Sequence, residues 1–407
     1  MSKKNIKLLH CADHHLRDSQ YARTSRREDF LKAFSSIVDV ALDNGVHAVL
    51  CCGDLFNGPR ISPYILEYVE NIHVRCLKHK LPFYVISGNH DFTKPHWAQS
   101  VRRPDDAEEY GIVFLDRTLT TIPGTAVTVF GAPAMSREEL LGEIGSWPTA
   151  DIHMWHGMVY DFLPKLAAHS GGGVHLHEIT DILKKCKFLA LGDLHIRRYE
   201  CVDPSSGALR DDGDIPMQEK DGRVAIDPRD DIVVGYPGST ELCYANEDTQ
   251  KTVTLVELDS EKYHTACALT ALPVVHRTYL KFRVVHEGQI EDVLTELSKH
   301  SESNPPVVIL YYNPNIQGVK ERIRSAIPGP EKLIQSIPVI AREKDAANIK
   351  SDLEGDRTPE DFIPEFITSG APHTSLGRDL LNPDPDTPVN AVVDDYIQKR
   401  KGELNIA

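Results

Sequence analysis

The fold is decided near the N-terminus by the stretch IKLLHCADHH, residues 6–15. Its first half is a short and mostly apolar run, and polar residues follow the run at once. Short apolar runs of this kind alternate with stretches of helical periodicity over the first two hundred residues, which is typical of an α/β sheet. The predicted strands are residues 6–11, 46–52, 81–86, 126–130, 152–155 and 188–191.

Two helices are predicted between the first strands. Apolar residues recur at helical spacing from Phe30 to Leu42, and Gly45 marks the C-terminal end of that helix. The second helix should begin at Ser62-Pro63, because serine is a favourable N-cap and proline suits the first helical position.

Five of the predicted strands run directly into aspartate, histidine or asparagine. The residues that follow them are Asp13, His15, Asp54, Asn89, His156, Asp193 and His195. In an open α/β sheet, ligands bind beyond the carboxyl ends of the strands, so we expect these side chains to surround one point. A single Asp-x-His is usually a turn, but five such groups at five strand ends together predict a metal site.

The motifs Asp-x-His, Gly-Asp, Gly-Asn-His-Asp, His-Gly and Gly-x-x-His occur in this order and resemble the calcineurin-like metallophosphoesterases. The resemblance implies an α/β fold with a β-sandwich flanked by helices, and two metal sites that share one carboxylate. The ligands of the first site would be Asp13, His15 and His195. Those of the second would be Asn89, His156 and Asp193. Asp54 would bridge the two ions.

The chemistry implied by this resemblance is hydrolysis of a phosphoester. Oxygen and imidazole ligands suit Mn²⁺, with Mg²⁺, Fe or Zn²⁺ as alternatives. Two ions roughly 3.5–4 Å apart can activate water and hold the attacking and leaving oxygens in line. His90 would protonate the leaving oxygen or stabilise the charge that develops, steadied by Asp91.

Two positions depart from the family pattern. Asp193 stands where the family usually has a histidine, which makes the second site harder and more anionic. Asn57 stands where DNA-repair relatives often carry histidine or aspartate, and we expect it to support the scissile phosphate.

Within the superfamily, further motifs resemble the SbcD-type exonuclease subunit of DNA double-strand-break repair. They are Arg27–Phe30, Gly53–Phe56, Val129–Pro133, Tyr236–Ser239 and Lys251–Leu258. This resemblance implies a Mn²⁺-dependent exonuclease and endonuclease acting on double-strand ends and single strands of DNA, in repair and recombination. It also implies a homodimer that works with an SbcC-type coiled-coil ATPase.

Two other functions remain open. One is a phosphodiesterase acting on nucleotides or other small phosphoesters, which would explain the metal motifs but not the C-terminal third of the chain. The other is a scaffold on an inactive phosphoesterase fold, which the seven metal-competent side chains disfavour.

The chain is expected to have three parts. Residues 1–270 would form the phosphoesterase domain, including an acidic loop or hairpin at 200–232. Residues 271–345 would form a small α/β capping domain, with strands near 278–285 and 306–312 and helices near 288–299 and 316–326. Residues 346–407 are rich in proline and acid, and would form a linker and a partner-binding helical tail with helices starting at Thr358 and Thr387.

Composition restricts the partners and the location. The net charge of −15 argues against a nonspecific nucleic-acid binder, but the negative excess lies in residues 200–262 and 341–407. The motif segments are nearly neutral, so bound cations would make their cleft positive. The eight cysteines include no CxxC, and no apolar run reaches membrane-spanning length, so we expect a cytoplasmic protein without a membrane partner.

Overall fold

The computed structural model describes residues 5–20, 23–91, 110–162, 172–214, 223–225, 231–244, 247, 250–259, 266–330 and 332–339. The chain divides into two compact units, Met1–Phe162 with Gly172–Lys350 and Leu163–Gly171 with Ser351–Ala407. The second unit lies outside the described residues, and so do the helices predicted after Thr358 and Thr387.

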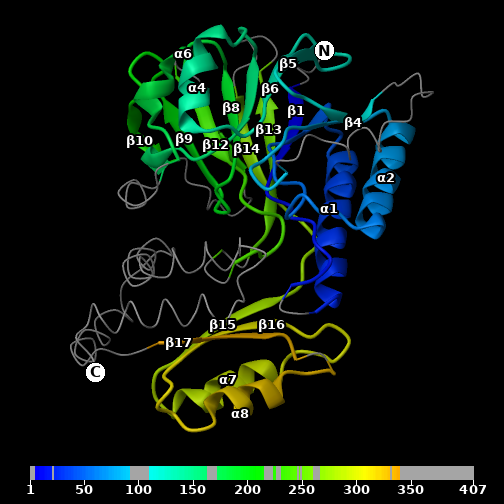
Figure 1. Cartoon of the computed structure of the whole chain (residues 1–407), viewed down its shortest axis with the longest axis vertical. Helices are drawn as coiled ribbons and strands as arrows, with labels where there is room; N and C mark the ends of the chain where they lie inside the picture. Colours follow the sequence, from blue (N-terminus) through cyan, green and yellow to red (C-terminus); the bar gives the residue numbers. More distant parts are fainter. Residues whose placement is uncertain are drawn as a thin grey trace, which may run out of the picture. The chain divides into compact units, whose positions relative to one another are not determined.

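The first unit contains two seven-stranded sheets among its described residues. The first sheet has the order β11 (Arg223–Ala225), β14 (Ala266–Pro273), β13 (Thr252–Leu258), β1 (Ile6–Cys11), β2 (Ala48–Cys51), β3 (Pro82–Val85) and β4 (Gly111–Phe114). Strands β1 to β4 are parallel, and β13 pairs antiparallel with β1, so that Ile6 faces Leu258. Residues from opposite ends of the domain therefore meet in its central strands (Figure 1).

The second sheet also has a parallel centre. Its order is β10 (Leu209–Asp214), β9 (Arg198–Val202), β12 (Ile232–Tyr236), β8 (Phe188–Gly192), β7 (Ile152–His156), β6 (Thr128–Ala132) and β5 (Thr118–Thr121). Strands β6, β7, β8 and β12 run parallel, and β9 and β10 form an antiparallel pair. That pair lies largely within residues 200–232, for which a loop or hairpin was predicted.

Successive side chains of each strand point to opposite faces of its sheet. The two sheets pack face to face because the apolar side chains on their inner faces form one core. In β1, Leu8 belongs to a core shared with the second sheet, whereas Leu9 belongs to a core shared with the helices. Met154 and Ala190 from the second sheet complete the inter-sheet core. This arrangement confirms the predicted α/β fold with sheets flanked by helices.

The helices cover the outer faces of the sandwich. Helices α1 (Ser25–Asp43) and α2 (Pro63–Lys78) contribute to the outer core of the first sheet, and α2 begins as predicted, with Ser62 Oγ accepting from the backbone N–H of Ile65. The shorter α4 (Arg137–Glu143) and α6 (Thr180–Leu183) lie beside the second sheet (Figure 1). Three short 3-10 helices connect elements: η1 (Ile144–Ser146), η2 (Tyr160–Phe162) and η3 (Leu176–Ile179). None of the described helices meets the length and apolarity that crossing a membrane requires.

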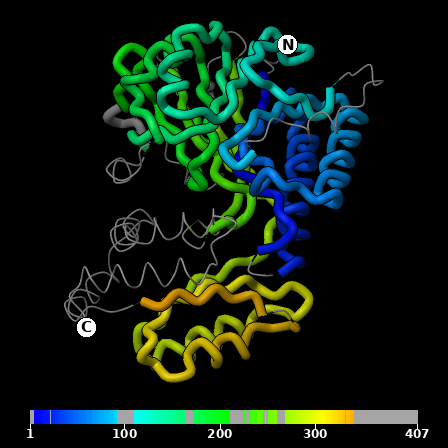
Figure 2. Tube along the Cα trace, in the orientation of Figure 1, coloured from blue at the N-terminus to red at the C-terminus, as the bar shows by residue number. Residues whose placement is uncertain are grey.

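A third, three-stranded sheet follows in the sequence. Its parallel strands are β15 (Tyr279–Val284), β16 (Val307–Tyr312) and β17 (Ile334–Pro338). Helices α7 (Gln289–Leu297) and α8 (Val319–Ala326) lie on one face of this sheet (Figure 1) and share its apolar core. Figure 2 shows these elements in yellow to orange, as one stretch of the sequence. The small α/β unit expected here is present, while its limits at 271 and 345 stay predictions.

Candidate metal centre

The predicted ligands lie at the carboxyl ends of strands from both sheets. Strands β1, β2 and β3 of the first sheet lead into Asp13, Asp54 and Asn89, and β7 and β8 of the second end at His156 and Gly192. Backbone hydrogen bonds join these ends within each sheet. The N–H of Asp13 donates to the Gly53 carbonyl (3.1 Å), and the N–H of Gly157 donates to that of Gly192 (3.1 Å). The five strand ends therefore come from two facing sheets, whereas the sequence argument placed them on one.

Four of the predicted ligands form a first cluster, in which Asp13, His15 and Asp54 are buried and His195 is partly buried. The Nε2 atoms of His15 and His195 lie 3.0 Å apart. The Nε2 atom of His195 lies 3.7 Å from Asp13 Oδ1, and that of His15 lies 3.4 Å from Asp54 Oδ2. The first predicted ligand set is thus brought together around one point.

The second cluster surrounds the Nε2 atom of His156. Asn89 Oδ1 lies 3.3 Å from this nitrogen, Asp54 Oδ2 3.6 Å and Asp193 Oδ1 3.7 Å. The same oxygen of Asp54 therefore faces both clusters. All seven residues selected from the sequence gather at this place, with Asp54 between the two groups.

The hydrogen bonds behind the histidines test whether cations fit here. The Nδ1 atom of His156 lies 2.7 Å from the Cys52 carbonyl oxygen, which can only accept, so Nδ1 carries the hydrogen. The neutral ring then presents its Nε2 lone pair to oxygens of Asp54, Asn89 and Asp193. Lone pairs that converge in this way repel one another unless a cation or a proton lies between them. Histidine ligands of metals are commonly oriented by such a bond from the other ring nitrogen, and the donor set fits divalent cations.

The charge balance agrees with this reading. Burial lowers the pKa of His156, but the carboxylates of Asp54, Asp13 and Asp193 outweigh burial and raise it to about 9. The carboxylates thus favour a positive charge at this point, and a divalent cation would supply it more fully than a proton does.

Backbone strain marks the same residues. Among the described residues, seven that are not glycine have positive φ, and four of these are predicted ligands: Asp13 (55°), His15 (46°), Asp54 (52°) and Asp193 (103°). Such conformations cost of order 1–3 kcal/mol each and persist where the surrounding structure holds them, often at functional sites.

Two glycines permit the close approach that the site needs. A Cβ atom on Gly88 would lie 2.1 Å from Asp54 Oδ1, and one on Gly192 would lie 1.9 Å from the Cys52 carbonyl oxygen. Any side chain at either position would displace Asp54 or the carbonyl that orients His156.

His90 and Asp91 have separate surroundings. The Nδ1 atom of His90 lies 3.1 Å from the backbone carbonyl oxygen of Asn57, and the backbone N–H of His90 donates to Asp54 Oδ1 (2.8 Å). The buried Asp91 carboxylate accepts from the backbone N–H groups of Leu55, Phe56 and Gly88. Asp91 thus holds the loop that leads to Asn57, whose carbonyl lies at the His90 ring, and its predicted role in steadying His90 stays a prediction. The side chain of Asn57 is exposed, as a substrate contact requires.

One residue of the site was not predicted from the sequence. Glu247 Oε1 lies 2.6 Å from His195 Nδ1, and its Oε2 accepts from Lys251 Nζ (2.6 Å) and Ser239 Oγ (2.8 Å). Burial raises the pKa of Glu247, but Lys251 and His195 outweigh burial and lower it to about 2, so the group is a carboxylate. Glu247 lies between the segments at Tyr236–Ser239 and Lys251–Leu258 that carry the SbcD resemblance, and an acidic residue between them is the signal that could have identified it.

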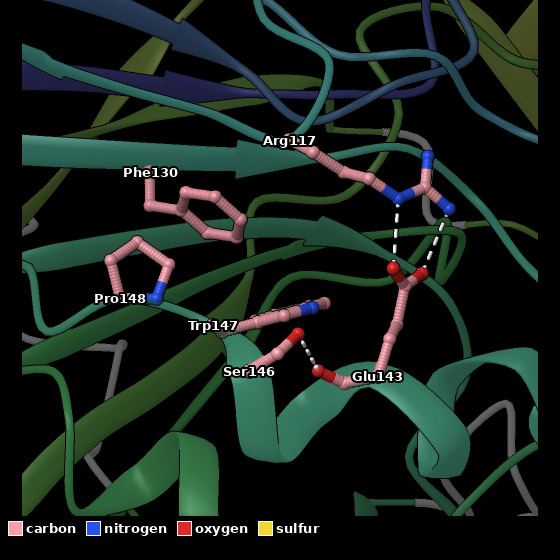
Figure 3. Close-up of a pocket in the computed structure, with 6 residues that line it drawn as sticks. All are labelled: Arg117, Phe130, Glu143, Ser146, Trp147 and Pro148. Atoms are coloured by element: carbon pink, nitrogen blue, oxygen red, sulfur yellow. Dashed lines mark hydrogen bonds and ion pairs between the residues drawn. The ribbon is translucent and has the colours of Figure 1, made fainter.

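A separate cavity lies away from these clusters. It has a volume of about 210 Å³ and is lined by Arg117, Phe130, Glu143, Ser146, Trp147 and Pro148. Figure 3 shows the two hydrogen bonds, each 2.8 Å, between the Arg117 guanidinium and the Glu143 carboxylate beside the aromatic rings. None of the seven predicted ligands lines this cavity.

Comparison with known proteins agrees with the geometry. Residues 6–197 match the family model described as calcineurin-like phosphoesterase. The DNA double-strand break repair protein Mre11 of Methanosarcina acetivorans is 24% identical over 362 residues, which are 84% of this chain and 51% of that protein. The proteins of the same name from Sulfolobus acidocaldarius and Sulfurisphaera tokodaii are 28% and 31% identical, over 50% and 55% of this chain and 53% and 59% of their own.

This chain spans about half the length of the curated relatives that it matches. The matched family segment contains all seven residues of the two clusters. Residues 6–197 therefore form a calcineurin-like metallophosphoesterase domain, in a chain whose homologues are of the Mre11/SbcD type.

Proposed function

We propose that the chain is a metal-dependent DNA phosphodiesterase, with exonuclease and endonuclease activity, and the nuclease subunit of an SbcCD-like complex. The observation that carries this proposal is that Asp54 Oδ2 lies between two clusters of nitrogen and oxygen ligands. Two divalent cations, most suitably Mn²⁺, would supply Lewis-acid activation of water and of the phosphate when bound there.

The side chains of the chain would then divide the work. Asp54 would bind both ions, while Cys52 and Glu247 fix the rings of His156 and His195. His90 lies at the edge of this group, its ring centroid 4.8 Å from that of His15. Because its Nδ1 is held at the Asn57 carbonyl, the protonated ring would donate from Nε2 to the leaving oxygen.

An exposed aromatic ring favours a nucleic acid as the substrate. The ring of Tyr244 stacks on that of His195, with centroids 5.4 Å apart and planes at 27°, and 53% of Tyr244 is accessible. Its outer face could stack with a base of a strand whose phosphate reaches the clusters, a contact worth about 1–3 kcal/mol per base. The names of the Mre11 relatives also favour DNA as the substrate.

The capping unit and the tail belong to the same proposal. Residues 271–345 would contact DNA beside the clusters, and residues 346–407 would bind the SbcC-type coiled-coil ATPase. A homodimer would then present two active sites to one DNA end. Each of these assignments rests on the SbcD resemblance and on the position of the segments in the chain.

The deciding experiment supplies Mn²⁺ and compares three substrates: linear duplex DNA, nucleotides and bis(p-nitrophenyl) phosphate. We expect hydrolysis of duplex DNA, and loss of that activity in Asp54→Ala but not in Asp43→Ala, an exposed aspartate at the end of α1. Hydrolysis of nucleotides without DNA would favour the small-phosphoester alternative. No hydrolysis of any of the three would contradict the enzyme assignment.

A further inference from the structure

A second group of metal-competent side chains lies behind the catalytic strand ends. Cys11, His14 and Cys51 each offer one ligand atom, and the three atoms lie within 4.8 Å of one another. Cys11 is the last residue of β1 and faces Cys51, the last residue of β2, in the parallel pairing of these strands. His14 follows on the loop after β1. None of the three belongs to the catalytic clusters.

The three side chains are buried, and one of their polar atoms is poorly hydrogen-bonded. The exposed fraction is 0% for both cysteines and 1% for His14. The Nδ1 atom of His14 lies 2.8 Å from Thr240 Oγ1, whereas its Nε2 atom is buried and, among the described residues, has no nitrogen or oxygen partner, only the weak thiol donor of Cys51. An unsatisfied buried polar group costs about 1–3 kcal/mol, so packing alone does not account for an imidazole here.

We propose that Cys11, His14 and Cys51 bind a Zn²⁺ ion that is separate from the catalytic cations. Thiolate sulfur and imidazole nitrogen are the ligands that Zn²⁺ takes in structural sites. Two thiolates also neutralise one Zn²⁺, and a neutral cluster suits a site without solvent because burying net charge is costly. With Nε2 on the ion, Nδ1–H of His14 would donate to Thr240 Oγ1 and orient the ring, as such bonds orient histidine ligands elsewhere.

Two other uses of these residues explain less. As small apolar side chains, Cys11 and Cys51 would suit the core, but His14 Nε2 would then have only a weak thiol donor as its partner. A disulfide between the two cysteines would leave the same nitrogen without a partner. A Zn²⁺ ion would use all three side chains.

The position of the site indicates what the ion would do. His14 stands between Asp13 and His15, whose backbones are both in the left-handed region. A cation that ties His14 to β1 and β2 would hold this strained loop, and with it two predicted catalytic ligands. The site would therefore be structural, and its existence does not depend on the substrate of the enzyme.

Cobalt spectroscopy on the full-length reduced protein tests the proposal, because thiolate ligands give Co²⁺ an intense near-ultraviolet absorption that oxygen and nitrogen ligands do not. After the catalytic clusters are filled with Mn²⁺, we expect one equivalent of Co²⁺ to produce this absorption, and Zn²⁺ to abolish it. The absorption should be lost in Cys51→Ser and in Cys51→Val, which preserves an apolar strand residue. It should weaken or shift in His14→Phe.

Cys243→Ser is the matched control, because Cys243 is also buried but lies beside His15 and His195. Its absorption should equal that of the unchanged protein. Absence of the absorption in the unchanged protein would overturn the proposal, whatever the folding of the variants. So would an absorption that survives Cys51→Val, one that disappears in Cys243→Ser, or one that Zn²⁺ cannot displace.

Discussion

At the scale of single residues, Asp54 has the most demanding position. One of its carboxylate oxygens lies 3.4 Å from His15 Nε2 and 3.6 Å from His156 Nε2, and the other accepts from the backbone of His90. If Asp54 binds both ions, the other ligands of either site cannot compensate for its loss. Asp54→Ala should therefore abolish hydrolysis and lower the bound metal at both sites, as measured by elemental analysis after dialysis.

The control for this variant is Asp43→Ala, which removes an exposed carboxylate and should change neither quantity. If Asp54→Ala hydrolysed DNA at the unchanged rate, or lost only one of two bound ions, the bridging role would be wrong.

His90 should affect the chemistry more than the metal. Its Nδ1 faces a carbonyl oxygen rather than the clusters, so His90→Asn should keep the metal content and DNA binding while the rate falls by about 10²-fold. His90 nevertheless offers a nitrogen within 4.8 Å of ligand atoms of His15 and Asp54. Metal loss in proportion to the loss of rate would thus identify His90 as a ligand instead.

A substitution of Glu247 measures how much metal binding depends on the carboxylate that orients the predicted ligand His195. Glu247→Gln keeps the size of the side chain but removes the charge that holds His195 Nδ1 and Lys251 Nζ. We expect the Mn²⁺ concentration for half-maximal activity to rise by about 10–100-fold, with much of kcat recovered at saturating Mn²⁺. Glu247→Asp should restore part of the affinity.

The comparison variant is Glu138→Gln, which changes an exposed carboxylate in the first turn of α4. An unchanged Mn²⁺ dependence in Glu247→Gln would show that His195 is oriented without it. A uniform loss of kcat at every Mn²⁺ concentration would point to a role other than positioning.

The sequence could reveal the seven ligands because each follows an apolar run within a few residues, a local pattern. Glu247 is different, since it reaches His195 from a loop after β12 that carries no such run. Its role depends on contacts across 52 residues of sequence, which no local pattern encodes.

At the scale of elements, the six predicted strands are confirmed to within two residues at each end. Strand β5 was missed because its residues Thr118–Thr121 are mostly exposed and threonine-rich, without an apolar run. The division of the strands between two sheets was also invisible to the strand-end argument. The pairing of Ile6 with Leu258 joins segments that are distant in the sequence. Hydrophobic periodicity predicts only the local secondary structure, so it cannot predict which strands pair.

Strand β7 carries a buried histidine whose titration should affect stability. His153 packs against Trp147 and Phe130, and burial lowers its pKa to about 4 although its bond to the Pro148 carbonyl opposes this. Between pH 6.5 and about 4, the unfolded chain binds a proton that the folded chain does not. The free energy of unfolding should therefore fall as pH falls through this window.

From pH 7 to pH 5, His153 should account for about 2 kcal/mol of the loss. Urea unfolding of His153→Gln should show a pH dependence smaller by about this amount, because glutamine does not titrate. His286→Gln, at an exposed position, is the control. An equal pH dependence in His153→Gln and the unchanged protein would contradict the assignment.

At the scale of the whole molecule, a buried ion network joins the third sheet to the phosphoesterase domain. The guanidinium of Arg26 in α1 donates to Asp29 (2.6 Å), to Glu241 (3.0 Å) and to the hydroxyl of Tyr279 in β15 (2.9 Å). Arg277 also contacts Asp29 (2.9 Å). A buried charge held by several partners is costly to break, so this network ties β15 to α1. The network thus connects the first strand of the proposed capping unit to α1.

The last prediction concerns the proposed tail, which lies outside the described residues and rests on sequence alone. From Val389, apolar residues recur at spacings of three and four: Val389, Val392, Val393, Tyr396 and Ile397. A short helix with such a stripe is marginal in water unless the stripe packs against something. If it docks on a coiled-coil ATPase, it raises the local concentration of the nuclease at a DNA end held by that ATPase. Deleting residues 385–407 should therefore spare the hydrolysis of bis(p-nitrophenyl) phosphate but weaken co-purification with the ATPase and ATP-stimulated cleavage of duplex DNA.

Val393→Asp, within the stripe, should reproduce the effect, whereas Gln398→Asp, outside it, should not. A truncated protein that misfolds or loses basal hydrolysis would instead place this segment in the catalytic domain.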